Sequence, residues 1–174
     1  MDEFDGLVGH LFRRCVIDFG KEDTMTTVTV DTQVAAPIEQ VFKVFTDLEH
    51  GAERVSNIQK IELLTPGGFA LGTRWVETRE VLGRLDSAEM EVTAFERNRT
   101  YTITHHKAGA RIDAVFTFEP VEGGTKVRIA YALESHGLPP GLLAPVMWVS
   151  ASKVRDVISG DLADLKASLE NRSA

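Results

Sequence analysis

Several kinds of residue and segment are scarce in this sequence, and each scarcity excludes a class of structure. A single cysteine, Cys15, leaves no intrachain disulfide, which fits a reducing cytoplasm. The net charge of −7 disfavours nucleic acid and anionic membrane surfaces as partners. The most apolar stretch, from Leu138 to Val149, is short and contains three prolines, so no segment is expected to span a membrane. We therefore expect a cytoplasmic protein that acts as a monomer or homodimer.

The sequence also lacks the motifs of metal, nucleotide and hydrolase sites. No H-E-x-x-H motif or cysteine pair occurs, and the adjacent His105 and His106 should face opposite sides of a strand. The glycines at 67, 68 and 72 lie between two expected strands, where no helix N-terminus could hold a phosphate. No G-x-S-x-G nucleophile elbow is present. We expect no metal, no cofactor and no nucleic-acid partner.

The first 24 residues differ from the rest of the chain. Apolar residues from Phe4 to Phe19 recur at helical spacing, which predicts an amphipathic helix, although Gly6 and Gly9 weaken it. One interpretation is a docking helix for a partner. The other is that Met25 is the true start, because codons for residues 21–23 can contain a purine-rich ribosome-binding sequence. The acidic N-terminus does not resemble a signal peptide. We expect an extension over 1–24 and one domain over 25–174.

From Met25 onward, short alternating segments dominate, and turn signals separate them. Turns are expected at Thr65–Gly68, near Gly83 and at Glu122–Gly124. The predicted strands are 27–34, 58–64, 72–81, 87–97, 100–106, 112–119 and 127–133. In the fourth of these, Ala88, Met90, Val92 and Ala94 are expected to share one face. Short connections make the last six strands antiparallel neighbours.

Two helical regions complete the expected α+β domain. A short helix follows Pro37, and a second helical turn or loop follows it over 50–57. After Pro139 and Pro140 the chain is helical to its end, with Pro145 expected to lie in the first turn or to divide off a short leading turn. Only this last helix is long enough to cover the apolar face of a seven-stranded sheet.

A curved sheet around one helix is expected to leave space between them. Long antiparallel strands coil, and a single helix does not fill the resulting groove. The helix offers little volume at Ser150, Ala151 and Ser152, so the space is expected near that half. Concave apolar sites of this kind are the usual places for small ligands.

The sequence resembles the START-like superfamily (SRPBCC), in particular its bacterial polyketide cyclase/dehydrase and lipid-transport branch, from about Thr26 to Leu169. The segments that carry the resemblance are Ala36–Pro37 with Val41–Phe42, Gly72–Trp75, Phe95–Arg99, Phe116–Pro120, Gly123–Val127 and Asp161–Lys166. The resemblance implies the helix-grip fold, a curved antiparallel sheet wrapped around a long C-terminal α-helix. Members range from lipid carriers to cyclases, so the fold does not identify the chemistry.

The leading hypothesis is that the protein binds an apolar or aromatic small molecule, lipid-like or polyketide-like, without catalysing a reaction. Arg79 and His105 would orient the polar end of this ligand. The expected ligand-binding residues are Trp75, Arg79, Met90, Tyr101, Ile103, His105, Phe116, Phe118, Tyr131 and Val149. No residue is assigned as catalytic. The alternative is a cyclase or dehydratase in which Arg79, His105 and a tyrosine perform acid/base chemistry.

A purely structural interpretation also exists for the same residues. Glu77 and Arg79 would then form a pair on the wet face of the sheet, and the tyrosines would cap the core with hydrated hydroxyls. In this interpretation the acidic region around Asp161 and Asp164 is solvated surface.

Overall fold

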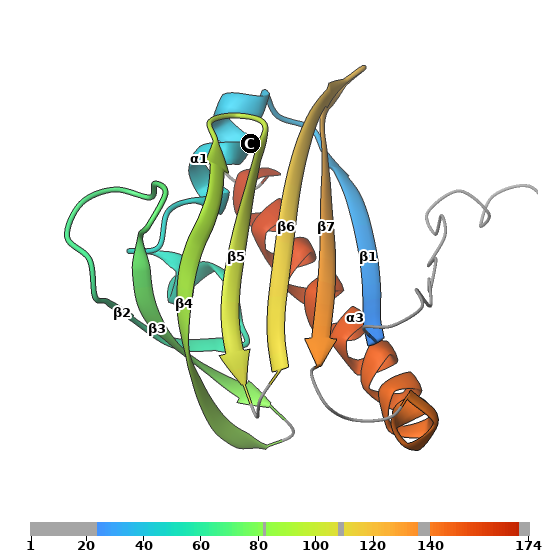
Figure 1. The fold of residues 1–174 in the computed structure, drawn as a ribbon. Helices are drawn as coiled ribbons and strands as arrows, with labels where there is room; N and C mark the ends of the chain where they lie inside the picture. The colour runs from blue at the N-terminus through green and yellow to red at the C-terminus, as the bar shows by residue number, and fades with distance from the viewer. Residues whose placement is uncertain (1–23, 82, 108–109, 136–139, 171–174) are drawn as a thin grey trace, which may run out of the picture.

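The computed structural model describes residues 24–81, 83–107, 110–135 and 140–170, with side chains described for 27–80, 83–107, 110–134 and 152–170. A seven-stranded sheet curves around a long C-terminal helix (Figure 1). The elements are β1 (Thr24–Val34), α1 (Ile38–Phe45), α2 (Gly51–Arg54), β2 (Ile58–Leu63), β3 (Arg74–Val81), β4 (Arg84–Glu96), β5 (Thr100–Lys107), β6 (Ala110–Val121), β7 (Gly124–Ser135) and α3 (Pro140–Glu170). The predicted fold class is confirmed, with every expected strand present.

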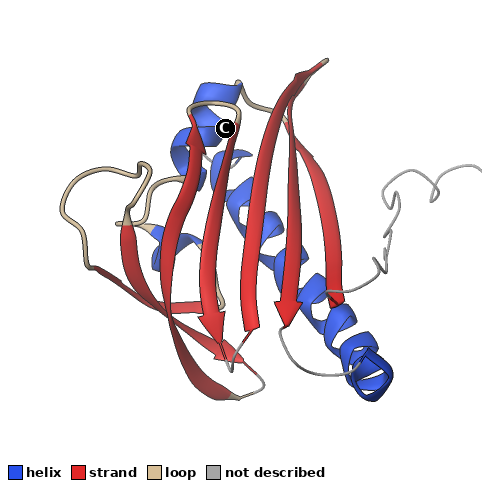
Figure 2. Ribbon diagram, viewed as in Figure 1, coloured by secondary structure: helices blue, strands red, loops and turns tan. Residues whose placement is uncertain are grey.

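The sheet order is β1-β7-β6-β5-β4-β3-β2, and every neighbouring pair is antiparallel. Strands β2 to β7 follow one another across the sheet, and β1 pairs with β7 at the far edge. The chain crosses from β1 to β2 through α1 and α2. All three helices lie on the same face of the sheet (Figure 2). This face is therefore the inner one, and its side chains form the core.

Local sequence explains the tight turns between strands. Gly123 has φ of 80° in the two-residue turn between β6 and β7, a conformation that glycine adopts without steric cost. Asn98, between β4 and β5, has φ of 58°, and asparagine tolerates this left-handed region better than most residues. These hairpins fix the pairing of the long central strands.

The alternation expected for β4 is wrong at its end. The register between β4 and β5 shifts between Val92 and Ala94, which marks a β-bulge. Because the extra residue reverses the alternation, Ala94 is exposed and Phe95 packs against the core. A bulge leaves no clear signal in the pattern of apolar residues, which explains why the sequence did not reveal it.

Helix α3 is continuous and crosses the inner face obliquely (Figure 1). It begins at Pro140 and runs without a break through Pro145, so Pro145 neither lies in the first turn nor divides off a leading turn. Proline has no backbone N–H, so the helix continues here with one backbone hydrogen bond fewer. Ile158, Leu162 and Leu169 then pack into the core.

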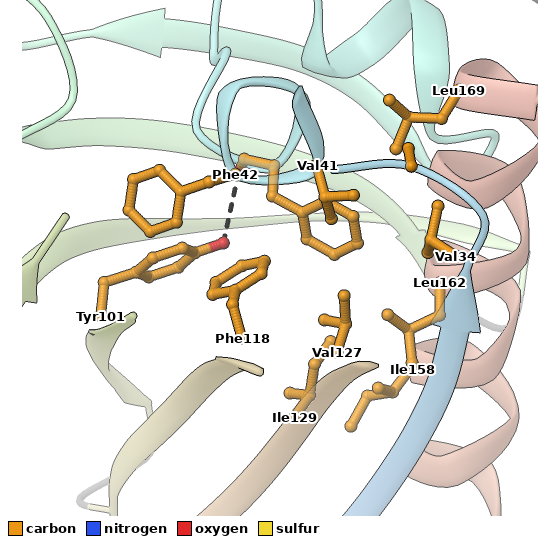
Figure 3. Packing of buried hydrophobic residues seen from close by; sticks show 12 residues of the cluster. Val34, Val41, Phe42, Tyr101, Phe118, Val127, Ile129, Ile158, Leu162 and Leu169 are labelled. Carbon is orange, nitrogen blue, oxygen red and sulfur yellow. Dashed lines mark hydrogen bonds between the residues drawn. The ribbon is translucent and has the colours of Figure 1, made fainter. Parts of the chain in front are cut away.

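An aromatic cluster fills the inner face where α1 meets the sheet (Figure 3). Phe42 of α1 contacts the rings of Tyr101 and Phe118 with centroid distances of 5.9 and 5.1 Å. The hydroxyl of Tyr101 donates a hydrogen bond to the backbone oxygen of Phe45 at 3.2 Å. The ring centroid of Phe69, from the loop between β2 and β3, lies 4.9 Å from that of Tyr101. We call the curved sheet together with α3 the grip. Its α1 end is filled by the aromatic side chains of the protein itself.

Among the described residues, no helix is both long and apolar enough to cross a membrane. The N-terminal extension over 1–24, and the choice between a docking helix and an upstream artefact, lie almost entirely outside the described residues.

Candidate functional site

Strand β3 places three large polar or aromatic side chains on the inner face of the sheet. Trp75, Glu77 and Arg79 are alternate residues of one strand, so they share one side of the sheet. Trp75 and Glu77 are buried, with exposed fractions of 1% and 7%. The indole Nε1 of Trp75 donates a hydrogen bond to Oε2 of Glu77 at 3.3 Å. The wet-face interpretation of Glu77 is therefore wrong.

Arg79 joins β3 to α3 through two carboxylates. Its Nε donates to Oε1 of Glu77 at 2.5 Å, and its Nη1 donates to Oδ2 of Asp161 at 2.6 Å. The side chain of Arg79 is 24% exposed and that of Asp161 is 15% exposed. Such partly buried, charge-assisted hydrogen bonds are stronger than neutral ones. We call Glu77, Arg79 and Asp161 the inner ion cluster.

Burial and charge act in opposite directions on the inner ion cluster. Burial alone would lower the pKa of Arg79, but the carboxylates of Glu77 and Asp161 outweigh it and raise the pKa above its usual value. Burial raises the pKa of Asp161, while Arg79 opposes that rise. The side chain of Asn57 also lowers the pKa of Asp161, but Oδ1 of Asp161 has no hydrogen bond of normal geometry within the described residues. The cluster is thus largely desolvated, and Asn57 is a further polar neighbour.

Two further polar side chains face the inner ion cluster from β5 and β7. Burial lowers the pKa of His105 below its usual 6.5, and Glu77 opposes this shift. Burial raises the pKa of Tyr131 to about 12. Their ring centroids are 6.3 Å apart. At neutral pH both groups are therefore uncharged, and neither makes a hydrogen bond with the described side chains or backbone. His106 is exposed on the opposite face, as predicted from strand alternation.

The other expected ligand residues fall into two groups. Tyr101, Phe116 and Phe118 belong to the aromatic cluster or pack against it, and the rings of Tyr101 and Phe116 stack at 4.5 Å. Met90, opposite Trp75 on β4, and Ile103 are half-buried on the inner face. The structure therefore separates the expected aromatic wall from the polar groups. Val149 and the thin segment 150–152 lie in the part of α3 where most side chains are outside the described residues.

The interpretation of the acidic helix region as solvated surface was wrong for Asp161. Asp161 is a member of the inner ion cluster, and Oδ2 of Asp164 accepts hydrogen bonds from the backbone N–H and hydroxyl of Ser56 at 2.8 and 2.7 Å. A usable signal was present, because Asp161 interrupts the apolar stripe that contains Ile158 and Leu162. An acid on the core-facing side of a helix needs a buried partner.

Residues 25–170 match the protein family described as polyketide cyclase / dehydrase and lipid transport. The chain belongs to this family. The match covers the sheet, α1, α2 and α3 almost completely. Among curated proteins, no match was found. The resemblance inferred from the turn and strand motifs is thereby confirmed.

Solved structures of the same fold include aromatase/cyclases and plant proteins. The Zhui aromatase/cyclase from Streptomyces sp. R1128 superposes with a TM-score of 0.71 at 15% identity, covering 86% of this chain and 96% of that chain. Ginseng major latex-like protein 151 from Panax ginseng gives 0.66 at 14% identity, covering 83% and 97%. The di-domain aromatase/cyclase StfQ of the steffimycin pathway gives 0.66 at 13% identity, covering 86% and 52%. At these identities the likeness establishes the helix-grip fold alone.

Proposed function

We propose that this protein binds an apolar or aromatic small molecule, lipid-like or polyketide-like, between the sheet and α3 in the cytoplasm. The observation that carries the proposal is the group of polar side chains inside the grip. Arg79 is held between Glu77 and Asp161, and the uncharged side chains of His105 and Tyr131 face this cluster without hydrogen-bonding to any of the described residues. Keeping a guanidinium and two carboxylates largely away from water costs stability, so their presence on the inner face favours a role with a ligand.

The arrangement suits recognition of a molecule with one polar end. Trp75, Met90 and Ile103 would contact its apolar body, and the polar groups would fix its orientation. The aromatic wall formed by Tyr101, Phe116 and Phe118 limits the space at the α1 end, because these rings already pack against one another. Val149 would contribute from α3. Membership of a family described by both cyclase and lipid-transport activities supports a ligand of this type.

A second candidate function is catalysis of a cyclisation or dehydration in the same place. The favouring observation is that an uncharged imidazole and an uncharged phenol lie close together, as a base and an acid could. The fold likeness to an aromatase/cyclase adds support for considering this chemistry. No residue is assigned a catalytic role, because binding alone explains the same geometry.

The first test is a thermal-shift screen of the full chain against lipids and aromatic compounds, with native mass spectrometry of the protein from its host. A bound compound, or a rise in melting temperature with an apolar compound, is expected. A chain that carries nothing and responds to no compound would argue against both functions.

Substitutions then separate a carrier from an enzyme. His105→Asn and Tyr131→Phe should weaken ligand affinity modestly in a carrier, whereas an enzyme should lose turnover with its ligand still bound. His106→Asn is the matched control, because His106 is the exposed neighbour on the same strand. If His105→Asn and His106→Asn changed affinity and turnover equally, the side chains of the inner face would have no special part in binding or catalysis.

A further inference from the structure

The charges of the inner ion cluster do not balance. Glu77 and Asp161 each carry a carboxylate, and Arg79 is the one guanidinium between them. With all three groups ionised, the cluster has a net charge of −1. Because Glu77 is 7% exposed, water screens this excess poorly.

Among the described residues, the neighbouring side chains of His105 and Tyr131 supply no further permanent positive charge. Among the described groups that shift the pKa of His105 or Tyr131, Arg79 is the one permanently charged cation. His106 lies on the exposed face. His105 itself is uncharged at neutral pH, because burial lowers its pKa. The interior described here is therefore short of positive charge.

The same cluster has room for a further hydrogen-bond donor. Oδ2 of Asp161 accepts from Arg79, whereas its buried Oδ1 has no hydrogen bond of normal geometry within the described residues, even though the amide of Asn57 is near enough to lower the pKa of Asp161. Arg79 already donates from both Nε and Nη1 to carboxylates. A carboxylate ligand would thus meet two carboxylates of like charge, and the guanidinium of Arg79 is the one positive charge shared between them, although its other N–H groups remain available.

We propose, on the basis of the proposed ligand-binding function, that the grip selects an apolar molecule whose polar end donates hydrogen bonds, such as an amine or a hydroxyl group. The corresponding carboxylic acid is rejected by like-charge repulsion from Glu77 and Asp161. A protonated amine balances the charge of the cluster, and a hydroxyl group supplies a donor without adding charge. Free fatty acids are therefore excluded as the preferred ligand class.

The test compares probes that differ only at the polar end. Calorimetry with the full chain would use 2-naphthylmethylamine, 2-naphthalenemethanol and 2-naphthoate, and in parallel octylamine, octanol and octanoate. The amine and the alcohol should bind at least about tenfold more tightly than the acid, as expected when like charges are brought together in a poorly hydrated site. An acid that binds as tightly as its alcohol overturns the inference and leaves the proposed function standing. Absence of binding by all six compounds rejects both.

Charge removal provides the second arm of the test. Asp161→Asn should bring the affinities of the amine and the acid at least about fivefold closer together, because it removes one of the two repelling carboxylates. Asp164→Asn is the matched control, since Asp164 lies one turn further along α3 and binds Ser56 instead of Arg79. Equal preferences in both variants and the unsubstituted chain would overturn the assignment. If Asp161→Asn does not fold, the ranking of probes by the unsubstituted chain still decides the matter.

Discussion

The inner face of the grip has two regions of opposite character. At the α1 end, Phe42, Tyr101 and Phe118 pack ring against ring, and the buried hydroxyl of Tyr101 has its acceptor on Phe45. On β3 and the middle of α3, the inner ion cluster is also largely buried, but its charge is unbalanced and Oδ1 of Asp161 has no hydrogen bond of normal geometry within the described residues. The first region therefore packs as a core, and the second is the part of the inner face where we propose that the ligand binds. The comparison separates a region whose burial stabilises the sheet from one in which charged groups are buried at a cost.

The largest expected effect concerns the aromatic region. Phe42→Ala should reduce the free energy of unfolding by about 3–5 kcal/mol, because it leaves a cavity among rings that lie 5–6 Å apart. Urea unfolding followed by circular dichroism would measure it. A loss below about 1 kcal/mol would mean that this region is adaptable and would weaken the contrast with the inner ion cluster.

The second effect concerns the inner ion cluster. Arg79→Met should cost about 3 kcal/mol, because it leaves Glu77 and Asp161 without their cation. The triple variant Glu77→Gln, Arg79→Met, Asp161→Asn should recover most of this loss, since replacing a whole buried ion cluster is often nearly neutral. Urea unfolding of both variants tests the prediction. Failure to recover would show that these charges stabilise the fold in their own right.

The two tyrosines provide a closer comparison of the same regions. Tyr101→Phe should cost about 1 kcal/mol, because it leaves the buried backbone oxygen of Phe45 without its donor. Tyr131→Phe should change stability by less than about 0.5 kcal/mol, because its hydroxyl has no partner among the described residues, and it should alter ligand affinity instead. Thermal unfolding with and without ligand measures both quantities. A reversed order of the two losses would contradict the division of the inner face.

A smaller effect is expected beside the inner ion cluster. Gly160→Ala should stabilise the protein by up to about 1 kcal/mol, since alanine favours the helix and the nearest atom to an added Cβ would be Nδ2 of Asn57 at 3.9 Å. Gly124→Ala is the contrasting control, because Gly124 has φ of 149° and its Cβ would overlap the backbone oxygen of Val34. Differential scanning calorimetry would show opposite shifts in melting temperature. A loss on Gly160→Ala would mean that α3 packs more tightly at this point than the structure indicates.

The smallest effect is a pH dependence from His105. Because its pKa is lower in the folded chain than the usual 6.5, the unfolded chain binds more protons as pH falls below about 6.5. Stability should therefore be fully present above that pH and decline as pH falls toward the lowered value. His105→Gln should reduce this decline, and His106→Gln should not. The urea midpoints of unfolding at pH 7.5 and 5.5 measure how much stability each variant loses on acidification. Equal losses in the two variants would contradict the assignment to His105.

Much of the fold could be predicted from local pattern. Alternating apolar residues and turn signals located all seven strands, and the long apolar stripe located α3. The pattern was wrong where tertiary packing overrides it, at the bulge that turns Phe95 inward and at Pro145 within α3. A bulge and a tolerated proline depend on neighbouring elements, so local sequence contains little information about them.

The candidate site was predicted in part. Strand alternation correctly separated the buried His105 from the exposed His106. Asp161 was missed, because its partner lies 82 positions away on another element. The sequence also grouped Tyr101 and Phe118 with the polar residues, whereas the structure places them in the closed aromatic cluster.

By itself, the sequence determined the antiparallel order of the strands, the helix that covers them and the family, because periodicity, turn chemistry and short motifs are local properties. Only the tertiary structure decided which inward-facing residues fill the core and which meet as a charged cluster. The pairing of Arg79 with Asp161 depends on how α3 crosses the sheet. That crossing results from packing over the whole inner face, which no segment of the chain specifies alone.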